Sequence, residues 1–235
     1  MDSKLWQKNY DKGVPTTIEY PKAPLFYFLE DAARKYPDRA CTIFKGAVVS
    51  YREMNALSDH MAAALVDMGV KKGDRVGIFM PNLPQFVVAY FGILKAGGVV
   101  VAVNPTYPVD EILIPVNDAG IEVMFTLSRF YGKLKEVRKK SKLKKIIVSN
   151  IKESLPPITR LLFTLVKEKK EGDKVDAQGV CLFQKISGQV RQRTFKAIAR
   201  FARLGVARQH KLLHLVQESL TVATRLTAFQ ALAPC

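Results

Sequence analysis

The sequence holds three histidines and three cysteines, and their spacing predicts no catalytic or metal site. His210 and His214 are four residues apart, so a helix would place both on one face as metal ligands, but the pair lacks the further ligands that a metal site needs. His60 stands alone in an amphipathic segment, where a structural or exposed histidine is expected. We therefore predict no catalytic residue, no cofactor-binding residue and no metal ligand in this chain. The cysteines are scattered and odd in number, which predicts free thiols in a reducing compartment: Cys41, Cys181 and Cys235.

Polar residues and prolines follow two apolar runs, and these are the remaining candidates for chemistry. Residues 80–82 read MPN and residues 104–106 read NPT. If the runs are parallel strands, both triplets lie at their carboxyl ends, where doubly wound sheets bind ligands. Turn chemistry alone also explains these residue types, because Asn and Pro dominate turns. The sequence leaves both interpretations open.

Helices and strands alternate through the first 150 residues. Ser50 and Glu53 form an S-x-x-E capping box, and Asn82 with Gln85 resembles a second one. Ser128 is expected to cap a later helix. The periodicity predicts helices over 25–36, 50–68, 82–96, 108–118 and from 128, with strands over 41–44, 47–49, 75–80, 99–103, up to 126 and 145–149.

This alternation predicts the fold class. The first two strands form a small hairpin, and the others are expected to be parallel because helices connect them. The apolar run at 99–103 lacks alternation, which favours a strand covered on both faces. We predict an α/β fold: a partial doubly wound, mostly parallel sheet with crossover helices, followed by a divergent helical C-terminal tail.

Four short motifs, in order, carry a resemblance to a known family. Residues 90–98 read YFGILKAGG, residues 103–105 read VNP and residues 118–120 read DAG. Upstream, residues 65–76 read LVDMGVKKGDRV. Together these resemble the early core of the AMP-forming acyl-adenylate superfamily, and most closely the long-chain fatty acid–CoA ligases.

The resemblance implies ATP, magnesium and coenzyme A as cofactors, and a fatty acid as substrate. It also implies a Ser/Thr/Gly-rich phosphate loop and a mobile C-terminal lysine, and no position of this sequence matches either one. The chain is therefore expected to be an N-terminal fragment of such a ligase, truncated, inactive alone and binding none of these cofactors. The competing hypotheses are a non-catalytic binding or dimerisation module and a basic binder of nucleic acid or membrane surfaces.

The domain organisation follows from composition. Residues 1–24 hold three prolines and read as an extended arm that packs along the next domain, residues 25–150 as the N-terminal α/β subdomain of an AMP-binding domain, and residues 151–175 as an amphipathic insertion. The insertion resembles one in bacterial fatty acid–CoA ligases, and an interfacial helix has this pattern of leucines and lysines. We expect a cytoplasmic protein, with peripheral membrane contact and a homo-oligomer as open alternatives.

Residues 176–235 form a divergent basic tail. The formal net charge of the chain is +16, and this last quarter supplies nine Lys and Arg against two acidic residues, with no Tyr or Trp. Without a recognisable aromatic stacking platform or recognition motif, specific nucleic-acid binding is not expected. The abrupt change favours the hypothesis that the tail is translated in a shifted reading frame. The rival hypothesis is a genuine helical tail, with helices near 190–204 and 208–232.

Overall fold

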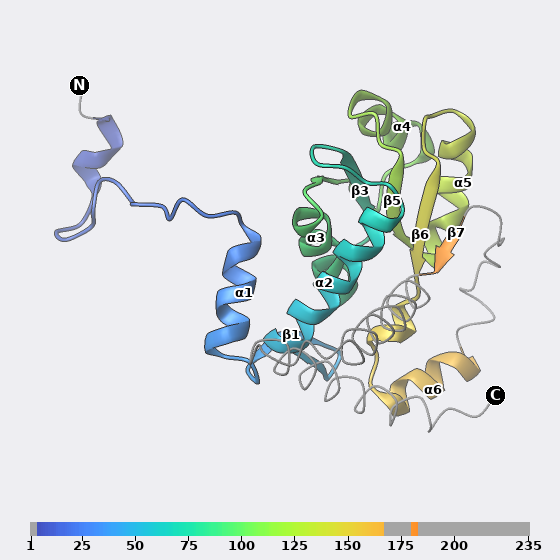
Figure 1. Ribbon diagram of the computed structural model, residues 1–235, viewed down its shortest axis with the longest axis horizontal. Coiled ribbons are helices and arrows are strands. Elements are labelled where there is room, and N and C mark those ends of the chain that lie inside the picture. Colours follow the sequence, from blue (N-terminus) through green and yellow to red (C-terminus); the bar gives the residue numbers. More distant parts are fainter. Residues whose placement is uncertain (1–3, 167–179, 183–235) are drawn as a thin grey trace, which may run out of the picture.

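The computed structural model describes residues 4–166 and 180–182 of the chain. Figure 1 shows an α/β body, with an N-terminal arm on one side. Its α-helices are α1 (Phe26–Lys35), α2 (Tyr51–Asp67), α3 (Pro84–Lys95), α4 (Val109–Asp118), α5 (Tyr131–Lys139) and α6 (Pro157–Val166), and its 3-10 helices are η1 (Leu5–Asn9), η2 (Ser128–Phe130) and η3 (Ile151–Ser154).

The strands form two separate sheets, as the alternation predicts. The first is the antiparallel hairpin of β1 (Ala40–Phe44) and β2 (Ala47–Ser50). The second is a parallel sheet in the order β4-β3-β5-β6-β7, so the chain crosses over between neighbours through helices. Its strands are β3 (Arg75–Phe79), β4 (Val99–Ala102), β5 (Val123–Leu127), β6 (Lys145–Ser149) and β7 (Val180–Leu182).

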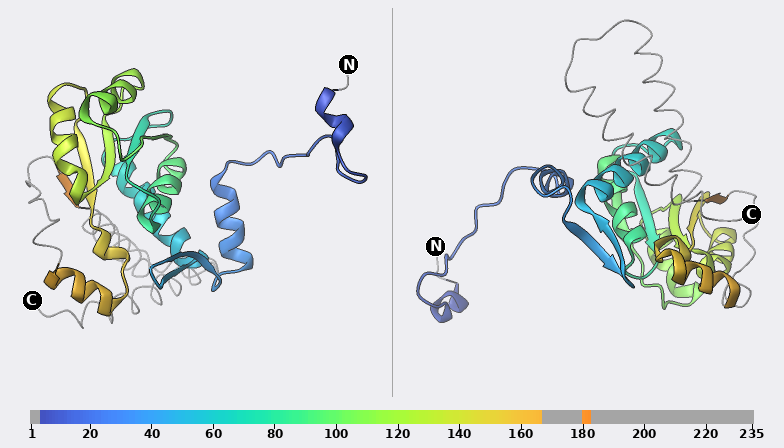
Figure 2. Two further views of the ribbon diagram at one scale, coloured as in Figure 1. Left: turned by 180° about the vertical axis from the view of Figure 1, so that it is seen from behind. Right: turned by 90° about the horizontal axis from the view of Figure 1, so that it is seen from below.

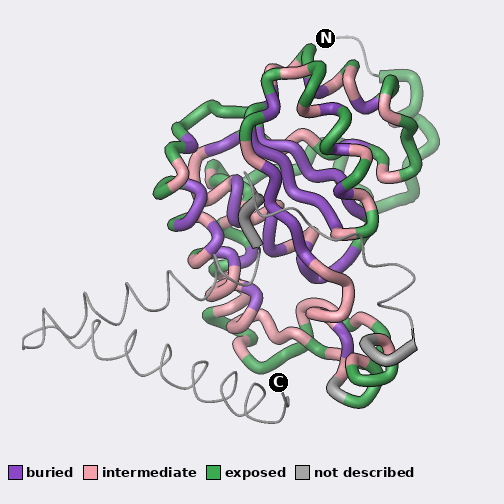
Figure 3. Tube along the Cα trace, turned by 90° about the vertical axis from the view of Figure 1, so that its right-hand side faces the viewer, coloured by how far each residue is buried: buried purple, intermediate pink, exposed green. Residues whose placement is uncertain are grey.

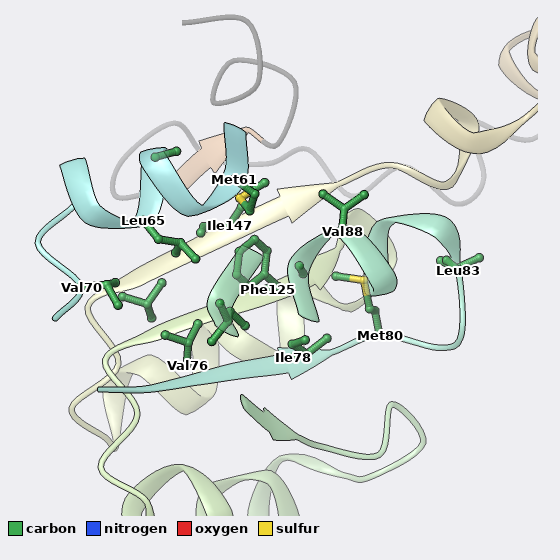
Figure 4. Packing of buried hydrophobic residues seen from close by; sticks show 14 of the residues in the cluster. Met61, Leu65, Val70, Val76, Ile78, Met80, Leu83, Val88, Phe125 and Ile147 are labelled. Atoms are coloured by element: carbon green, nitrogen blue, oxygen red, sulfur yellow. The ribbon is translucent and has the colours of Figure 1, made fainter. Parts of the chain in front are cut away.

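Both faces of the parallel sheet are covered by helices, which explains why the central strands are mostly apolar (Figures 1 and 3). On one face, Val76 and Ile78 of β3 pack with Met61 and Leu65 of α2, as Figure 4 shows. The opposite face belongs to a second cluster beneath α4 and α5, which includes Phe79, Ile112, Leu134, Ile146 and Val148. Successive residues of one strand therefore enter different cores.

One expectation about the sheet is wrong. The run 99–103 was predicted to be covered on both faces, but β4 is an edge strand with a mixed burial pattern, and 47% of Val99 is exposed. The fully buried strand is β5, which lies between β3 and β6. An apolar run cannot by itself distinguish the two positions, because an edge strand also packs its side chains on helices.

One of the three predicted helix caps is confirmed. The Ser50 side chain accepts from the backbone N–H of Glu53, and the Glu53 carboxylate accepts from the Ser50 backbone, which is a complete capping box. Asn82 is not a cap, because α3 begins two residues later at Pro84. Ser128 is not a cap either, since it begins η2 and α5 follows from Tyr131.

Glycine permits the close packing of α2 on α3. A Cβ added at Gly92 would lie 2.7 Å from Cγ of Met61, closer than side chains approach one another. The end of α3 also needs glycine, because Gly97 has φ of 82°. Both residues belong to the YFGILKAGG run, so part of that motif has a packing explanation.

The arm does not pack along the body as predicted. Residues 4–24 extend away from it in both views of Figure 2, and the arm's largest apolar side chains are exposed, among them Leu5, Trp6 and Tyr20. Within the described arm, the Gln7 side chain donates a hydrogen bond to the carbonyl of Thr16, a contact internal to the arm. No residue of 4–24 is buried, so the arm makes no close packing contact with the described body.

The sheet continues past the predicted start of the tail at residue 176. Strand β7 pairs in parallel with β6, with Val180 opposite Ile146. The helices predicted near 190–204 and 208–232 lie outside the described residues, as do His210, His214 and Cys235. None of the described helices is long and apolar enough to cross a membrane.

Candidate functional site

The carboxyl ends of the parallel strands meet at one edge of the sheet, where the MPN and NPT triplets were expected. Asn82 and Asn104 both lie there, and both are exposed. Met80, the first residue of the MPN triplet, and Leu83, which follows the triplet, are buried after the end of β3, as Figure 4 shows. The parallel topology therefore brings the two triplets to the same edge of the sheet, as predicted.

The side chain of Asn104 stabilises a turn. Its Oδ1 accepts from the backbone N–H of Thr106 at 3.0 Å and from the Thr106 hydroxyl at 2.8 Å. This side chain closes an Asx turn directly after β4, which is the usual role of Asn at a strand end. The interpretation as a turn residue therefore holds for Asn104.

Gln85 links the start of α3 to the end of β6. Its Nε2 donates to the carbonyl of Asn150 at 3.2 Å, and only 4% of the residue is exposed. Its Oε1 is buried and has no hydrogen-bond partner among the described residues. A buried amide oxygen without a donor is costly, so this edge retains an unused acceptor.

Ser149 and Glu153 form a second polar pair beside it. The Ser149 hydroxyl donates to Oε2 of Glu153 at 2.9 Å, and Ser149 is almost fully buried. Burial raises the pKa of the Glu153 carboxyl, while the hydrogen bond from Ser149 opposes that rise. Asn150, between them, accepts from the backbone N–H of Lys152 and so begins η3.

Thr126 connects β5 to β3 at the middle of this edge. Its hydroxyl donates to the carbonyl of Phe79 at 3.0 Å, which joins the last residue of β3 to β5. Gln85, Thr126 and Asn150 therefore fix the ends of three neighbouring strands and the start of α3. The arrangement positions backbone and side-chain dipoles at these strand ends.

Metal chemistry is not supported by the described residues. They contain no group of three or more His, Cys, Asp or Glu side chains that could hold a metal ion. Burial raises the pKa of the Cys41 thiol, which keeps it protonated at neutral pH and thus unreactive. His60 is partly exposed on α2 and has an interaction partner.

The basic run from Lys133 to Lys145 is largely engaged within the protein. Lys133 donates to the carbonyl of Tyr107, and Lys145 donates to the carbonyl of Met68. Two other lysines of the run pair with carboxylates: Lys139 with Glu136 and Lys144 with Glu122. These contacts favour the solvated-helix interpretation of the run over a phosphate-binding patch.

Comparison with known families decides what kind of α/β unit this is. The sequence model described as "AMP-binding enzyme" matches residues 29–194, which is more than half of the chain. This chain belongs to the AMP-binding enzyme family. The matched range begins in α1, includes the whole parallel sheet and passes the expected boundary at residue 176.

Two relatives in the AMP-binding family are called long-chain-fatty-acid–CoA ligases. The protein from Bacillus subtilis is 32% identical over 167 residues, covering 71% of this chain and 30% of its own length. The protein from Salmonella typhimurium is 36% identical over 154 residues, covering 65% of this chain and 28% of its own. The chain therefore spans about three tenths of these relatives.

A solved structure shows the same fold. The crystal structure of an anthranilate CoA ligase in complex with anthranoyl-AMP superposes with a TM-score of 0.58 and 17% identity, covering 71% of this chain and 28% of that protein. At this identity the likeness supports the AMP-binding fold alone. It confirms the α/β architecture predicted from the alternating helices and strands.

Sequence analysis missed the interior polar contacts of this edge. Gln85 was interpreted as half of a capping box, whereas its side chain reaches β6 across 65 positions of sequence. Ser149 was counted only as a strand end, and Glu153 was not singled out. The signal in the sequence is that Gln85 and Ser149 adjoin apolar segments. This does not specify the partners of their side chains.

Proposed function

We propose that residues 25–150 are the N-terminal α/β subdomain of an ATP-dependent fatty acid–CoA ligase. The whole enzyme would join a fatty acid to AMP with release of pyrophosphate, and then transfer the acyl group to coenzyme A. The observation that carries the proposal is the 32–36% identity to proteins named long-chain-fatty-acid–CoA ligases, over most of this chain. Membership of the AMP-binding family implies ATP use by its enzymes.

The residues of this chain would act as the scaffold of that reaction. Gln85, Thr126 and Asn104 hold the strand ends and loops in place at the edge where sheets of this class bind ligands. No acidic cluster for magnesium exists among the described residues, and no stretch of the sequence reads as a Gly-rich phosphate loop. We infer that this chain by itself does not adenylate fatty acids, and we derive no reaction step from it.

A chimeric enzyme tests the proposed activity. Residues 1–182 would replace the matching part of the Bacillus subtilis relative, and pyrophosphate release would be followed with ATP, coenzyme A and either oleate or anthranilate. We expect turnover with oleate. A folded chimera that prefers anthranilate would overturn the proposed substrate class. The chain of 235 residues alone serves as control, and fatty-acid-dependent pyrophosphate release from it would refute the inferred inactivity.

A second candidate is a non-catalytic dimerisation module, favoured by the open edge of β4. Val99 at this edge is 47% exposed, and exposed edge strands tend to pair with other chains. Light scattering on the purified chain separates the candidates. A molar mass that stays that of a monomer at all protein concentrations would count against the dimerisation module. A stable dimer of a chain that lacks ligase activity would support it.

A further inference from the structure

The ammonium of Lys95, the last residue of α3, lies among polar side chains of two other helices. Its Nζ donates to Oδ1 of Asp59 at 2.6 Å and to Oδ1 of Asn55 at 2.7 Å, both on α2. It also lies 3.8 Å from Oε1 of Glu30 on α1. Only 6% of the Lys95 side chain is exposed, and a cation so far removed from water depends on its partners. We call these four residues the Lys95 cluster, which joins α1, α2 and α3.

The rest of α1 is weakly attached to the body. Leu29 is the one residue of α1 that is buried, and it belongs to the core cluster shared with α2 and α3. Asp31 pairs with Arg34 and Lys35 of the same helix, so these ion pairs do not tie α1 to the body. Among the described residues, the docking of α1 therefore depends mainly on one buried side chain and on the Lys95 cluster.

The two ends of α1 differ in how they are held. After its C-terminal end, the carbonyls of Pro37 and Arg39 accept from the backbone N–H groups of Arg52 and Tyr51 at the start of α2. At its N-terminal end α1 continues into the arm, as Figure 1 shows, and no residue of 4–25 is buried. The segment 36–39 is therefore a fixed point about which α1 can turn.

We propose that α1 detaches from α2 and α3 as a unit, pivoting at Pro37, and that the Lys95 cluster is the latch that holds it in place. A helix of ten residues is marginal in water without packing, so α1 unwinds when it leaves the body. Opening uncovers the core cluster to which Leu29 belongs and moves the arm together with α1. The proposal does not rest on the ligase function, because it concerns the docking of one helix.

Hydrogen exchange of the full chain, followed by mass spectrometry, tests the detachment. Peptides from 26–35, 51–67 and 84–95 report on α1, α2 and α3 separately. We expect the amides of α1 to exchange at least about tenfold faster than those of α2 and α3, because local opening precedes global unfolding. Exchange in α1 that is as slow as in the other two helices refutes the detachment.

Glu30→Gln separates the latch from the packing of α2 on α3. It removes the carboxylate that α1 contributes to the Lys95 cluster and keeps both hydrogen bonds from Lys95 to α2. We expect exchange in α1 to rise about twofold to fivefold, with α2 and α3 unchanged. The matched control is Glu136→Gln, which breaks the pair with Lys139 inside α5 and should leave α1 unchanged. Wild-type exchange of α1 in Glu30→Gln refutes the latch.

Lys95→Met removes the centre of the latch. Methionine keeps most of the aliphatic stem and deletes the ammonium, so we expect exchange in α1 to rise about tenfold, more than in α2 or α3. A rise of equal size in all three helices would mean that Lys95 supports the packing of α2 on α3, and the proposal fails. Circular dichroism melting shows whether each variant is folded. If Lys95→Met does not fold, Glu30→Gln, at a half-exposed position, decides the question.

Discussion

The two ends of the parallel sheet differ in how completely their polar groups are paired. At the amino end, Lys145 donates to the carbonyl of Met68 at 2.6 Å, and Arg75 donates to the carbonyl of Ala119 at 2.8 Å. Met68 and Ala119 are the C-terminal caps of α2 and α4, so each cation lies where the helix dipole favours positive charge. A glycine with positive φ follows each cap: Gly69 and Gly120.

At the carboxyl end the polar groups are neutral or hard to ionise. Gln85 keeps a buried amide oxygen without a partner among the described residues, and burial raises the pKa of Glu153. The amino end is thus closed by its own helix caps, while the carboxyl end carries hydrogen-bonding capacity that the described residues leave unused. In sheets of this class that is the end at which ligands bind.

Gln85→Ala is expected to cost the most, about 2–3 kcal/mol of unfolding free energy. It removes the donor to Asn150, leaves that carbonyl without a partner and opens a cavity beneath α3. Urea denaturation followed by circular dichroism measures the loss.

Gln85→Met is the matched control, because it nearly keeps the volume and removes the unpaired oxygen. We expect it to cost about 1 kcal/mol. Equal losses for the two variants would mean that packing is unimportant here and that the lost hydrogen bond to Asn150 accounts for the whole cost.

Lys145→Met is expected to cost about 1 kcal/mol through loss of the cap on α2. Its neighbour Lys144 provides the comparison, since it forms an exposed ion pair with Glu122 at 2.8 Å. Lys144→Met should change stability by less than about 0.5 kcal/mol. The difference between the two, measured in parallel melts, tests whether the amino end depends on its cations.

Glu153→Gln tests the carboxyl end through pH. Because burial raises the pKa of Glu153, the folded protein holds this proton more tightly than the unfolded chain. Wild-type stability should therefore fall as pH rises from the ordinary value of 4.5 through the raised pKa, and the glutamine variant should escape that loss. We expect the variant to match wild type near pH 4 and to exceed it by about 1 kcal/mol at pH 8.

Glu136→Gln supplies a control of opposite sign. The hydrogen bond from Lys139 lowers the pKa of Glu136, so its contribution is present at neutral pH and is lost as pH falls. The glutamine variant should be slightly less stable than wild type at pH 7 and equal to it in acid. If both variants changed stability in the same direction, burial would not be the cause at Glu153.

Much of the fold follows from local signals, and the candidate site does not. The Ser50–Glu53 capping box and Gly97 mark their boundaries because the atoms that satisfy them are a few residues away. The edge position of β4 depends on which strand pairs with β3, and the contact from Gln85 to Asn150 spans 65 residues. Neither is encoded in a window of sequence, so both needed the three-dimensional structure.

Asn104→Ala is expected to cost about 0.5–1 kcal/mol, because it removes two hydrogen bonds from an exposed turn. Asn104→Asp keeps an acceptor for both donors and should retain most of the stability. In the chimera with the Bacillus subtilis relative, the two variants distinguish a turn from a ligand contact. If Asn104 only closes the turn, Asp restores both stability and the KM for ATP. If its amide N–H₂ also contacts a ligand, Asp restores stability but leaves KM raised. That outcome would make Asn104 a candidate ligand-binding residue. The turn after β4 would then share with the interior of the carboxyl end a polar group that a ligand can use.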